Sequence, residues 1–241
     1  MEASFRKTLT LLPCLILAGA TITGDAAAQS VSLGADLVSR YVWRGADFGE
    51  SLSVQPALSV AGSGFELGAW ASYATNPDGA GVNELDLWLG YTIETESSGS
   101  FSFGATDYYF PAPDAPDLFN FENDGAGAHW LEPYASYTGP ASFPITLYGG
   151  VFVHNDPDKC VYLEASWPVT VEDVELGFTA GASAGESTLY GTNKFTFINL
   201  GVSASKAIPI TDRFSLPISV AYIVNPTPGT ARSFLVFGIS L

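Results

Sequence analysis

Charged side chains recur at even spacings in the first alternating run of this chain. Asp36, Arg40 and Arg44 stand four residues apart, so on an extended strand they share one face. Further acids occupy the same frame of later runs: Glu66, Glu84, Asp86, Glu94, Glu132 and Glu164. Arginines on one wall of a lumen and carboxylates on another can orient small polar solutes, so all these residues are predicted to line a charged constriction. Charge pairs that simply fill a narrow lumen are the alternative.

Few residues are available for covalent chemistry. The chain has two histidines, His129 and His154, and a hydrolase would need one of them beside a serine and an orienting group. Ser136 and Ser187 qualify only by elimination, because no nucleophile motif surrounds either. Cys160 has no adjacent base and no partner cysteine once the leader is removed. The sequence therefore predicts neither an enzyme nor a bound cofactor.

One acidic stretch has part of the spacing of a calcium loop. Residues 120–125 place oxygen atoms as the first half of such a loop does, but the twelfth position is Leu131, so the bidentate glutamate is missing. No metal site is predicted. The weaker expectation is an outer loop that gathers divalent ions loosely through Asp114, Asp117, Glu122 and Asp124.

Strands must position these residues, and the chain offers about a dozen runs that alternate with period two. In the cleanest run, residues 84–94, every second side chain is apolar. The final residues alternate as well, with an apolar face made of Leu235, Phe237, Ile239 and Leu241. Such a strand can close a sheet against the first one. We therefore predict an all-β fold, a single antiparallel transmembrane β-barrel of about 12 strands (range 10–14). A soluble secreted β-sandwich is the weaker alternative.

Aromatic residues divide between the two faces of the predicted strands. Those near strand ends fall mostly in the outward frame, as interfacial belts require: Tyr41, Trp43, Tyr73, Tyr91, Tyr109, Tyr137, Trp167 and Tyr222. Trp70, Trp88 and Trp130 fall in the lumenal frame, where they would stack on sugars or pack against the wall. Asp107 falls in the outward frame, so a bulge or a place at the membrane rim is expected there.

The connections between runs alternate in length. With the N-terminus on the periplasmic side, the odd connections are extracellular, and they include the longest and most acidic one, Pro111–Ala128. This loop is predicted to cap the lumen or to fold into its mouth. Several even connections are short turns of Gly, Ser or Pro, as outer-membrane barrels show.

Residues 1–28 read as an export signal, with Arg6 and Lys7 before an apolar run and three alanines at 26–28 as a cleavage site. The apolar run is shorter than the ~20 residues of a membrane-spanning helix. Removing the signal takes away two acids and two bases, so the remaining barrel domain, residues 29–241, keeps 23 acids, 7 bases and a net charge of −16. This excess of acid excludes nucleic acid as a partner. A mean hydropathy of +0.22 without a membrane helix fits a barrel that faces lipid.

Three segments carry a resemblance to a known family. They are Leu33–Gly45, which reads LGADLVSRYVWRG, Gln55–Ala57, and Glu84–Tyr91, which reads ELDLWLGY. Over the first ninety or so residues the chain resembles the TorF-like family of bacterial outer-membrane porins. The resemblance implies an export signal, a single barrel, a pore and no enzyme chemistry.

The sequence thus predicts a passive outer-membrane channel for small polar or ionic solutes, with a cation preference if its carboxylates outweigh the arginine pair. A closed barrel that acts through its extracellular loops is the alternative. The predicted partners are outer-membrane lipid and lipopolysaccharide, small solutes, and the barrel-assembly machinery through the C-terminal strand.

Overall fold

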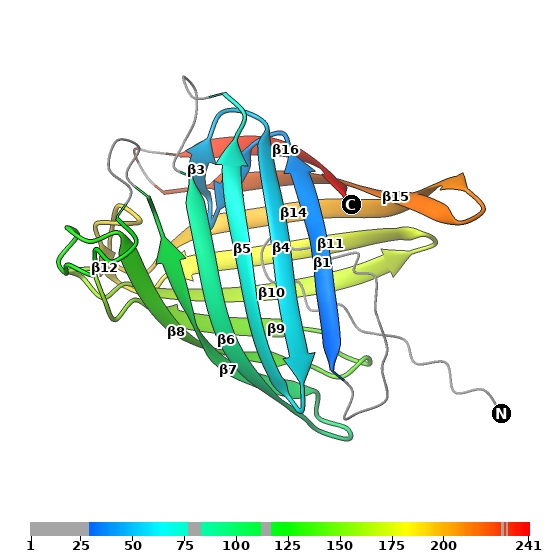
Figure 1. Ribbon diagram of the computed structural model, residues 1–241, viewed down its shortest axis with the longest axis horizontal. Coiled ribbons are helices and arrows are strands. Elements are labelled where there is room, and N and C mark those ends of the chain that lie inside the picture. The colour runs from blue at the N-terminus through cyan, green and yellow to red at the C-terminus, as the bar shows by residue number, and fades with distance from the viewer. Residues whose placement is uncertain (1–28, 77–82, 112–116, 228, 230) are drawn as a thin grey trace.

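The computed structural model describes residues 29–76, 83–111, 117–227, 229 and 231–241. The predicted export signal, residues 1–28, lies outside the described residues. Twelve strands form a closed antiparallel barrel, which confirms the predicted fold (Figure 1). They are β1 (Ser30–Val38), β4 (Ser53–Gly62), β5 (Phe65–Ala74), β6 (Glu84–Glu94), β7 (Ser100–Tyr109), β8 (His129–Thr138), β9 (Thr146–Val151), β10 (Val161–Val171), β11 (Val174–Ser183), β14 (Thr196–Thr211), β15 (Phe214–Asn225) and β16 (Arg232–Ser240).

The barrel closes where its last strand pairs with its first. β16 lies antiparallel to β1, with Asp36 opposite Ser240 and Val38 opposite Gly238. Beyond β16, the Leu241 amide donates to the Ala35 carbonyl at 2.9 Å. Closure leaves no unpaired sheet edge among the barrel strands, which is what a strand-built membrane span requires.

The connections lie at two distinct ends of the barrel. We call one the loop end, because the long connections that follow β1, β5, β7, β9, β11 and β15 leave the wall there. We call the other the turn end, because it carries the short connections 63–64, 95–99, 139–145, 172–173 and 212–213. β1 starts and β16 finishes at the turn end, so the loop lengths follow the predicted alternation.

The wall alternates between lumen and exterior along each strand. In β4, Ser53, Gln55 and Ser59 are buried, whereas Leu58 and Val60 are exposed. The exposed side chains of the outer face are large and apolar: Leu33, Leu67, Leu89, Phe103, Leu163, Phe178, Val202, Tyr222, Leu235 and Phe237. Among the described residues there is no helix that could cross a membrane.

Four short strands lie outside the wall, in two hairpins at the loop end. They are β2 (Tyr41–Trp43) with β3 (Ala46–Gly49), and β12 (Glu186–Ser187) with β13 (Thr192–Asn193). The first hairpin corrects a prediction: β1 ends at Val38, so Arg40 and Arg44 do not continue its face. Tyr41 is buried in an aromatic cluster with Trp70 rather than belonging to an outer belt.

Candidate functional site in the lumen

The β2–β3 hairpin folds into the barrel and reaches the opposite wall. Its tip is a tight turn in which Arg44 and Gly45 adopt left-handed backbone angles, with φ of 49° and 75°. A Cβ at Gly45 would overlap the carbonyl oxygen of Ile198 on β14, so only glycine fits there. The Asn225 side chain on β15 donates to the Gly45 carbonyl at 3.1 Å. The tip is therefore held from across the lumen.

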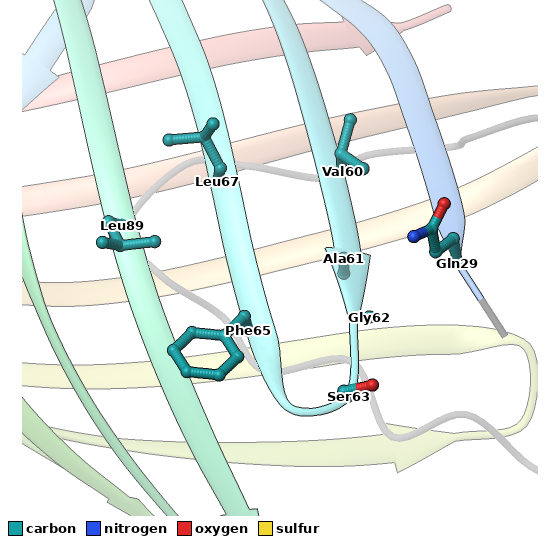
Figure 2. Close-up of a pocket in the computed structure, with 8 residues that line it drawn as sticks. All are labelled: Gln29, Val60, Ala61, Gly62, Ser63, Phe65, Leu67 and Leu89. Carbon is teal, nitrogen blue, oxygen red and sulfur yellow. The ribbon is translucent and has the colours of Figure 1, made fainter. Parts of the chain in front are cut away.

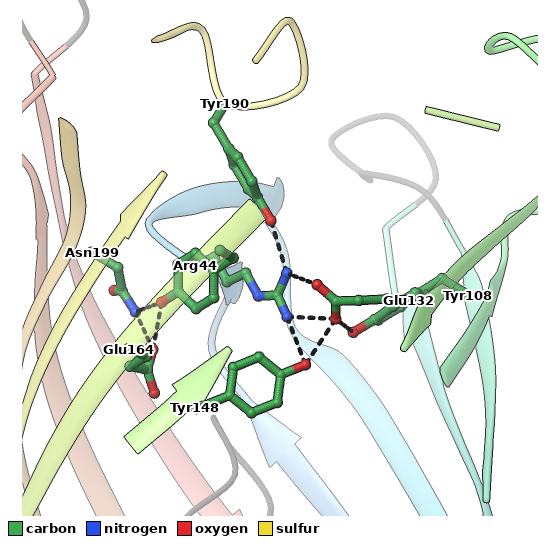
Figure 3. A network of polar contacts seen from close by, with 8 residues as sticks. Arg44, Tyr108, Glu132, Tyr148, Glu164, Tyr190 and Asn199 are labelled. Atoms are coloured by element: carbon green, nitrogen blue, oxygen red, sulfur yellow. Dashed lines mark hydrogen bonds and ion pairs between the residues drawn. The ribbon is translucent and has the colours of Figure 1, made fainter. Parts of the chain in front are cut away.

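Arg44 is the centre of a buried polar network (Figure 3). Its two terminal nitrogens bind the two carboxylate oxygens of Glu132 on β8, each at 2.7 Å. The side chains of both residues are almost fully buried, at 3% and 0% exposure. A bidentate pair of this kind has the strongest geometry that an ion pair can take, and breaking a buried pair costs about 3–5 kcal/mol.

Tyrosines from three wall strands and one loop complete the network. The hydroxyls of Tyr108 and Tyr148 donate to Glu132 at 2.8 and 2.9 Å. Tyr190, in the β12–β13 loop, accepts from Arg44 at 2.8 Å. The guanidinium carbon lies 4.2 Å from the centre of the Tyr162 ring, which adds cation–π attraction. The Glu132 carboxylate thus has hydrogen-bond donors on several sides.

The rest of the hairpin packs against the other sides of the wall. Tyr41 lies 5.4 Å from Trp70 on β5, measured between ring centres. Val42 packs with Phe234 and Val236 of β16. Trp43 lies 5.6 Å from Tyr108 on β7. With Gly45 against β14 and Arg44 against β8, the hairpin touches the wall all round and fills the lumen at the loop end.

The lumen at the turn end has a different lining. The alternation there presents small, half-buried polar side chains: Ser32, Thr92, Ser102, Ser136, Ser203 and Ser219. Glu66 is also half-buried in this region, and Glu94 is exposed at the end of β6. None of these side chains is large enough to cross the lumen, so this half of the barrel lacks the packing seen at the loop end.

The structure brings together some of the predicted lining residues and separates others. Asp36, Glu66, Glu84, Asp86, Glu94, Glu132 and Glu164 all lie in the lumenal frame of their strands. Only Arg44 and Glu132 form a pair, and Glu164 hydrogen-bonds Tyr162 and Asn199. Arg40 lies in the bend after β1, where it binds Asp47 at 2.8 Å. The predicted shared face of Arg40 and Arg44 is wrong, because the chain leaves the wall between them.

The described part of the acidic loop does not enter the mouth. Its described part, residues 117–128, folds against the outer face of β7 and β8, where Phe121 stacks on His129 at 3.9 Å between ring centres. His129 binds Asp107 at 2.9 Å and the Leu118 carbonyl at 2.8 Å. No register shift occurs at Asp107, so the expected bulge is absent and the acid is instead paired at the rim. Of the weak metal candidates, Asp114 lies outside the described residues.

Sequence reasoning missed the loop that follows β9. Asn155 is fully buried and binds the acidic loop through Gly125 and Gly127, at 2.8 and 3.2 Å. Asp156, Asp158 and Cys160 place ligand atoms within 4.8 Å of one another, which no group containing Asp117, Glu122 or Asp124 does in the described part of the chain. Both carboxylate oxygens of Asp156 already accept backbone amides of this loop.

The lumenal tyrosines were missed too, although they had a signal. Tyr108, Tyr148 and Tyr162 fall in the same alternating frame as Glu132 and Glu164, so the pattern placed them in the lumen. The pattern says nothing of what they contact. Their partner, Arg44, comes from a segment that alternation assigned to the wall.

A shallow pocket on the outer face is unrelated to this network (Figure 2). It lies at the turn end, has a volume of about 270 Å³, and is lined mainly by outward apolar side chains such as Val60, Phe65, Leu67 and Leu89. Because these side chains belong to the exposed apolar surface, the pocket offers no chemistry of its own.

A bacterial protein family described as of unknown function, Gcw_chp, matches residues 23–232 of this chain. The chain belongs to the Gcw_chp family. The match covers eleven of the twelve wall strands fully and the start of β16, including the β2–β3 hairpin and Glu132. Comparison with curated proteins and with solved structures finds no match. The Gcw_chp family name carries no activity, so function has to be argued from the lumen itself.

Proposed function

We propose that this Gcw_chp protein is an outer-membrane channel for small cations and polar solutes, which its own β2–β3 hairpin holds closed. The observation that carries the proposal is the contrast within one lumen. The loop end is filled by the hairpin, whereas the turn end is lined by small polar side chains. A lumen that is blocked in only one half fits a closed gate.

The outer face supports a place in the membrane. Its exposed side chains are large and apolar on strand after strand, and a soluble protein rarely shows so much apolar surface. In a bilayer the same side chains would contact lipid. The predicted export signal agrees with this location. The resemblance of residues 33–45, 55–57 and 84–91 to TorF-like porins also supports it.

The number of strands in the barrel is compatible with an aqueous channel and does not require a lumen filled by side chains. Eight-stranded barrels have room only for side chains, while those of 16–18 strands leave an aqueous channel. Twelve strands lie between these cases, so the side chains decide whether space remains. Towards the turn end most of them are serine, threonine and glycine, with Glu66 and with Tyr134 lying over Gly90 and Gly104. Side chains as small as serine, threonine and glycine leave room for water. This lining supports an aqueous vestibule.

The charges of the wall support a preference for cations. Arg44 is neutralised by Glu132, and Arg40 by Asp47 outside the wall. Asp36, Glu66 and the Glu84–Asp86 pair have no basic side chain within ion-pair distance in the described structure. Once the hairpin moves away, a permeating ion would meet an acidic wall.

A permanently closed barrel is the second candidate, and one observation favours it. The hairpin is anchored by a buried ion pair and touches the wall on all sides, so it resembles a core as much as a gate. In that case the protein would act through its loops. Neither candidate uses catalysis.

Single-channel recording separates the two candidates. The chain from residue 29 onward would be refolded in detergent, tested for folding by a heat-dependent gel shift, and inserted into a planar bilayer. We expect brief, rare openings with a cation-biased reversal potential, and much longer openings for Arg44→Ala. Arg40→Ala, which removes only a half-exposed ion pair, should change little. Folded Arg44→Ala protein that never conducts would establish the closed barrel.

A further inference from the structure

Three tryptophans occupy the lumenal frame of the wall, and one of them lies flat against it. Trp70 is buried, at 6% exposure, and Trp130 packs edge-on against Phe152. Trp88 on β6 is half-buried, and a Cβ at Gly68, its partner on β5, would overlap its ring. The ring atoms Cε2 and Cη2 lie almost equally far from that Cβ position and Cζ2 lies nearest, so the face of the indole covers the glycine. The opposite face is turned toward the lumen.

A tyrosine lies along the neighbouring strands in a similar way. Tyr134 on β8 pairs with Gly104 on β7, which pairs with Gly90 on β6. A Cβ at Gly104 would lie 2.6 Å from both Cζ and the hydroxyl oxygen of Tyr134, and one at Gly90 would lie 2.9 Å from the same oxygen. The half-buried Tyr134 side chain therefore runs over two glycines to β6, the strand of Trp88. We call Trp88 and Tyr134, which cover adjoining parts of the wall, the aromatic floor.

A carboxylate without a partner lies beside the aromatic floor. Glu66 on β5 pairs with Gly90 and is half-buried. It interacts electrostatically with Tyr134, but no hydrogen bond or basic side chain holds it among the described residues. The hydroxyls of Thr92 and Ser102, which follow on the same lumenal faces, bond each other at 2.8 Å. Two aromatic faces and a free acceptor are thus presented to the lumen together.

We propose that Trp88, Tyr134 and Glu66 form a binding site for a neutral saccharide, in the vestibule beneath the hairpin. A pyranose has an apolar face of C–H groups that stacks on an aromatic ring, and a rim of hydroxyls that donate to a carboxylate. An acidic sugar would be repelled by Glu66. The proposal deepens the proposed function and rests on it, since it names the class of polar solute that enters the lumen.

The site borders the hairpin that fills the loop end. Trp88 packs against the aromatic cluster that contains Tyr41 of the hairpin. Tyr134 stacks on Tyr148, at 5.6 Å between ring centres, and the Tyr148 hydroxyl accepts from Arg44 at 3.2 Å. A saccharide on the aromatic floor would therefore lie where the packed half of the lumen ends and the vestibule begins.

The arrangement of the two rings favours a sugar over an organic cation. Cations are held best by aromatic faces that enclose them from several sides. Trp88 and Tyr134 instead lie on one wall, over glycines on three neighbouring strands. A flat platform of this kind suits a ligand that is itself flat on one face.

Saturation-transfer NMR tests the site without any need for conduction. The refolded chain from residue 29 onward would be mixed with maltotriose or cellotriose, and the transfer to the sugar protons would be measured. We expect saturable binding, with the strongest transfer to the C–H protons of the ring faces. Trp88→Leu should weaken binding about tenfold, as the loss of an aromatic contact does. Glu66→Gln, which keeps the shape of the side chain, should weaken it less.

Gly68→Ala tests the platform while keeping all three binding residues. Its Cβ would push the Trp88 ring away from the wall, so binding should weaken although no aromatic or polar group is lost. The matched control is Gly201→Ala, where an added Cβ would lie 3.6 Å from the nearest atom. Trp167→Leu is a second control, because it removes a tryptophan that packs against Phe143 on the outer face. Neither control should alter binding.

The outcomes separate this site from the channel. Absence of transfer from folded wild-type protein to either sugar would overturn the proposal, and so would unchanged binding in Trp88→Leu. Binding of tetramethylammonium in place of the sugars would assign the aromatic floor to organic cations and overturn it as well. Saccharide binding by a barrel that never conducts would remove the channel but keep the site, and conduction without binding would do the reverse.

Discussion

The two halves of the lumen share the same twelve strands but differ in what they enclose. At the loop end, tyrosines and tryptophans meet the hairpin around Arg44, with almost no exposed surface. At the turn end, serines and threonines line the wall and stay half-exposed. Because the strand ladders run through both halves, the barrel closes without a packed interior at the turn end. The hairpin and the aromatic side chains that fill the loop end are therefore not needed to close the barrel, which points to a functional role for them.

The largest loss of stability is expected from Glu132→Ala, at the loop end. It leaves the Arg44 charge buried without its partner and removes the acceptor of Tyr108 and Tyr148. We expect a loss of about 3–5 kcal/mol in unfolding free energy, measured by urea unfolding in detergent followed by tryptophan fluorescence.

The matched control for this change lies in the other half. Glu175→Ala removes a carboxylate at the turn end of β11 that is already exposed to water, so the midpoint should stay within about 0.5 kcal/mol of wild type. Equal losses for the two variants would mean that the halves do not differ in packing.

A smaller effect on stability, but a direct one on the gate, is expected from Gly45→Val. The new side chain overlaps the Ile198 carbonyl and also forces a β-branched residue to a φ of 75°. Seating the hairpin should become unfavourable by about 2–3 kcal/mol, while the wall strands keep their pairing. We expect a folded barrel with long open times in bilayer recordings.

Gly191→Ala separates backbone strain from displacement of the hairpin. Gly191 also has a positive φ, of 65°, but an added Cβ there meets no atom within 4 Å. This variant should introduce backbone strain without displacing the hairpin, so its conductance should match that of the wild-type protein. Open channels in Gly191→Ala would show that loop strain, and not the hairpin, controls opening.

Two lumenal glycines differ in the space around them. A Cβ at Gly150, on β9, would lie 2.5 Å from Glu132 Oε1, whereas one at Gly201, on β14, would lie 3.6 Å from the nearest atom, in Thr179. Gly150→Ala should cost about 1–3 kcal/mol, as overpacking does. Gly201→Ala should be neutral or slightly stabilising, since alanine loses less backbone entropy than glycine on folding. Thermal midpoints of the heat-dependent gel shift would measure both.

The smallest effect concerns the Cys160 thiol, beside the loop-end network. Burial raises the pKa of this thiol to about 12, so only a very small fraction is thiolate at pH 8. We expect slow alkylation by iodoacetamide in wild-type protein at pH 8, with the rate still rising at pH 10. In Gly45→Val, where the hairpin leaves, alkylation should be faster. Fast alkylation of wild-type protein would mean that the loop end is open to solvent.

The twelve-stranded wall can be predicted from the amino-acid sequence alone. Strict alternation over twelve runs placed Leu58, Leu89 and Phe237 outside and Glu84 and Glu132 inside, because the period of a strand is two and each side chain has only two faces to choose from. The connections between the runs gave the alternation of long loops and short turns. These features are local, so they can be read from neighbouring residues.

How the lumen is filled depends on contacts between residues far apart in the chain. Residues 41–44 alternate as a wall strand would, with Tyr41 and Trp43 on one face, yet they turn inward, because a lumenal hairpin has the same period as the wall. What holds the hairpin there is distant in the chain: Arg44 meets Glu132 across 88 positions, and Gly45 meets Asn225 across 180. The described part of the acidic loop lies outside for a nearer reason, because Phe121 and Leu118 contact His129, at most 11 positions along the chain. The contacts of the hairpin, by contrast, depend on closure of the barrel, and no local pattern can encode them.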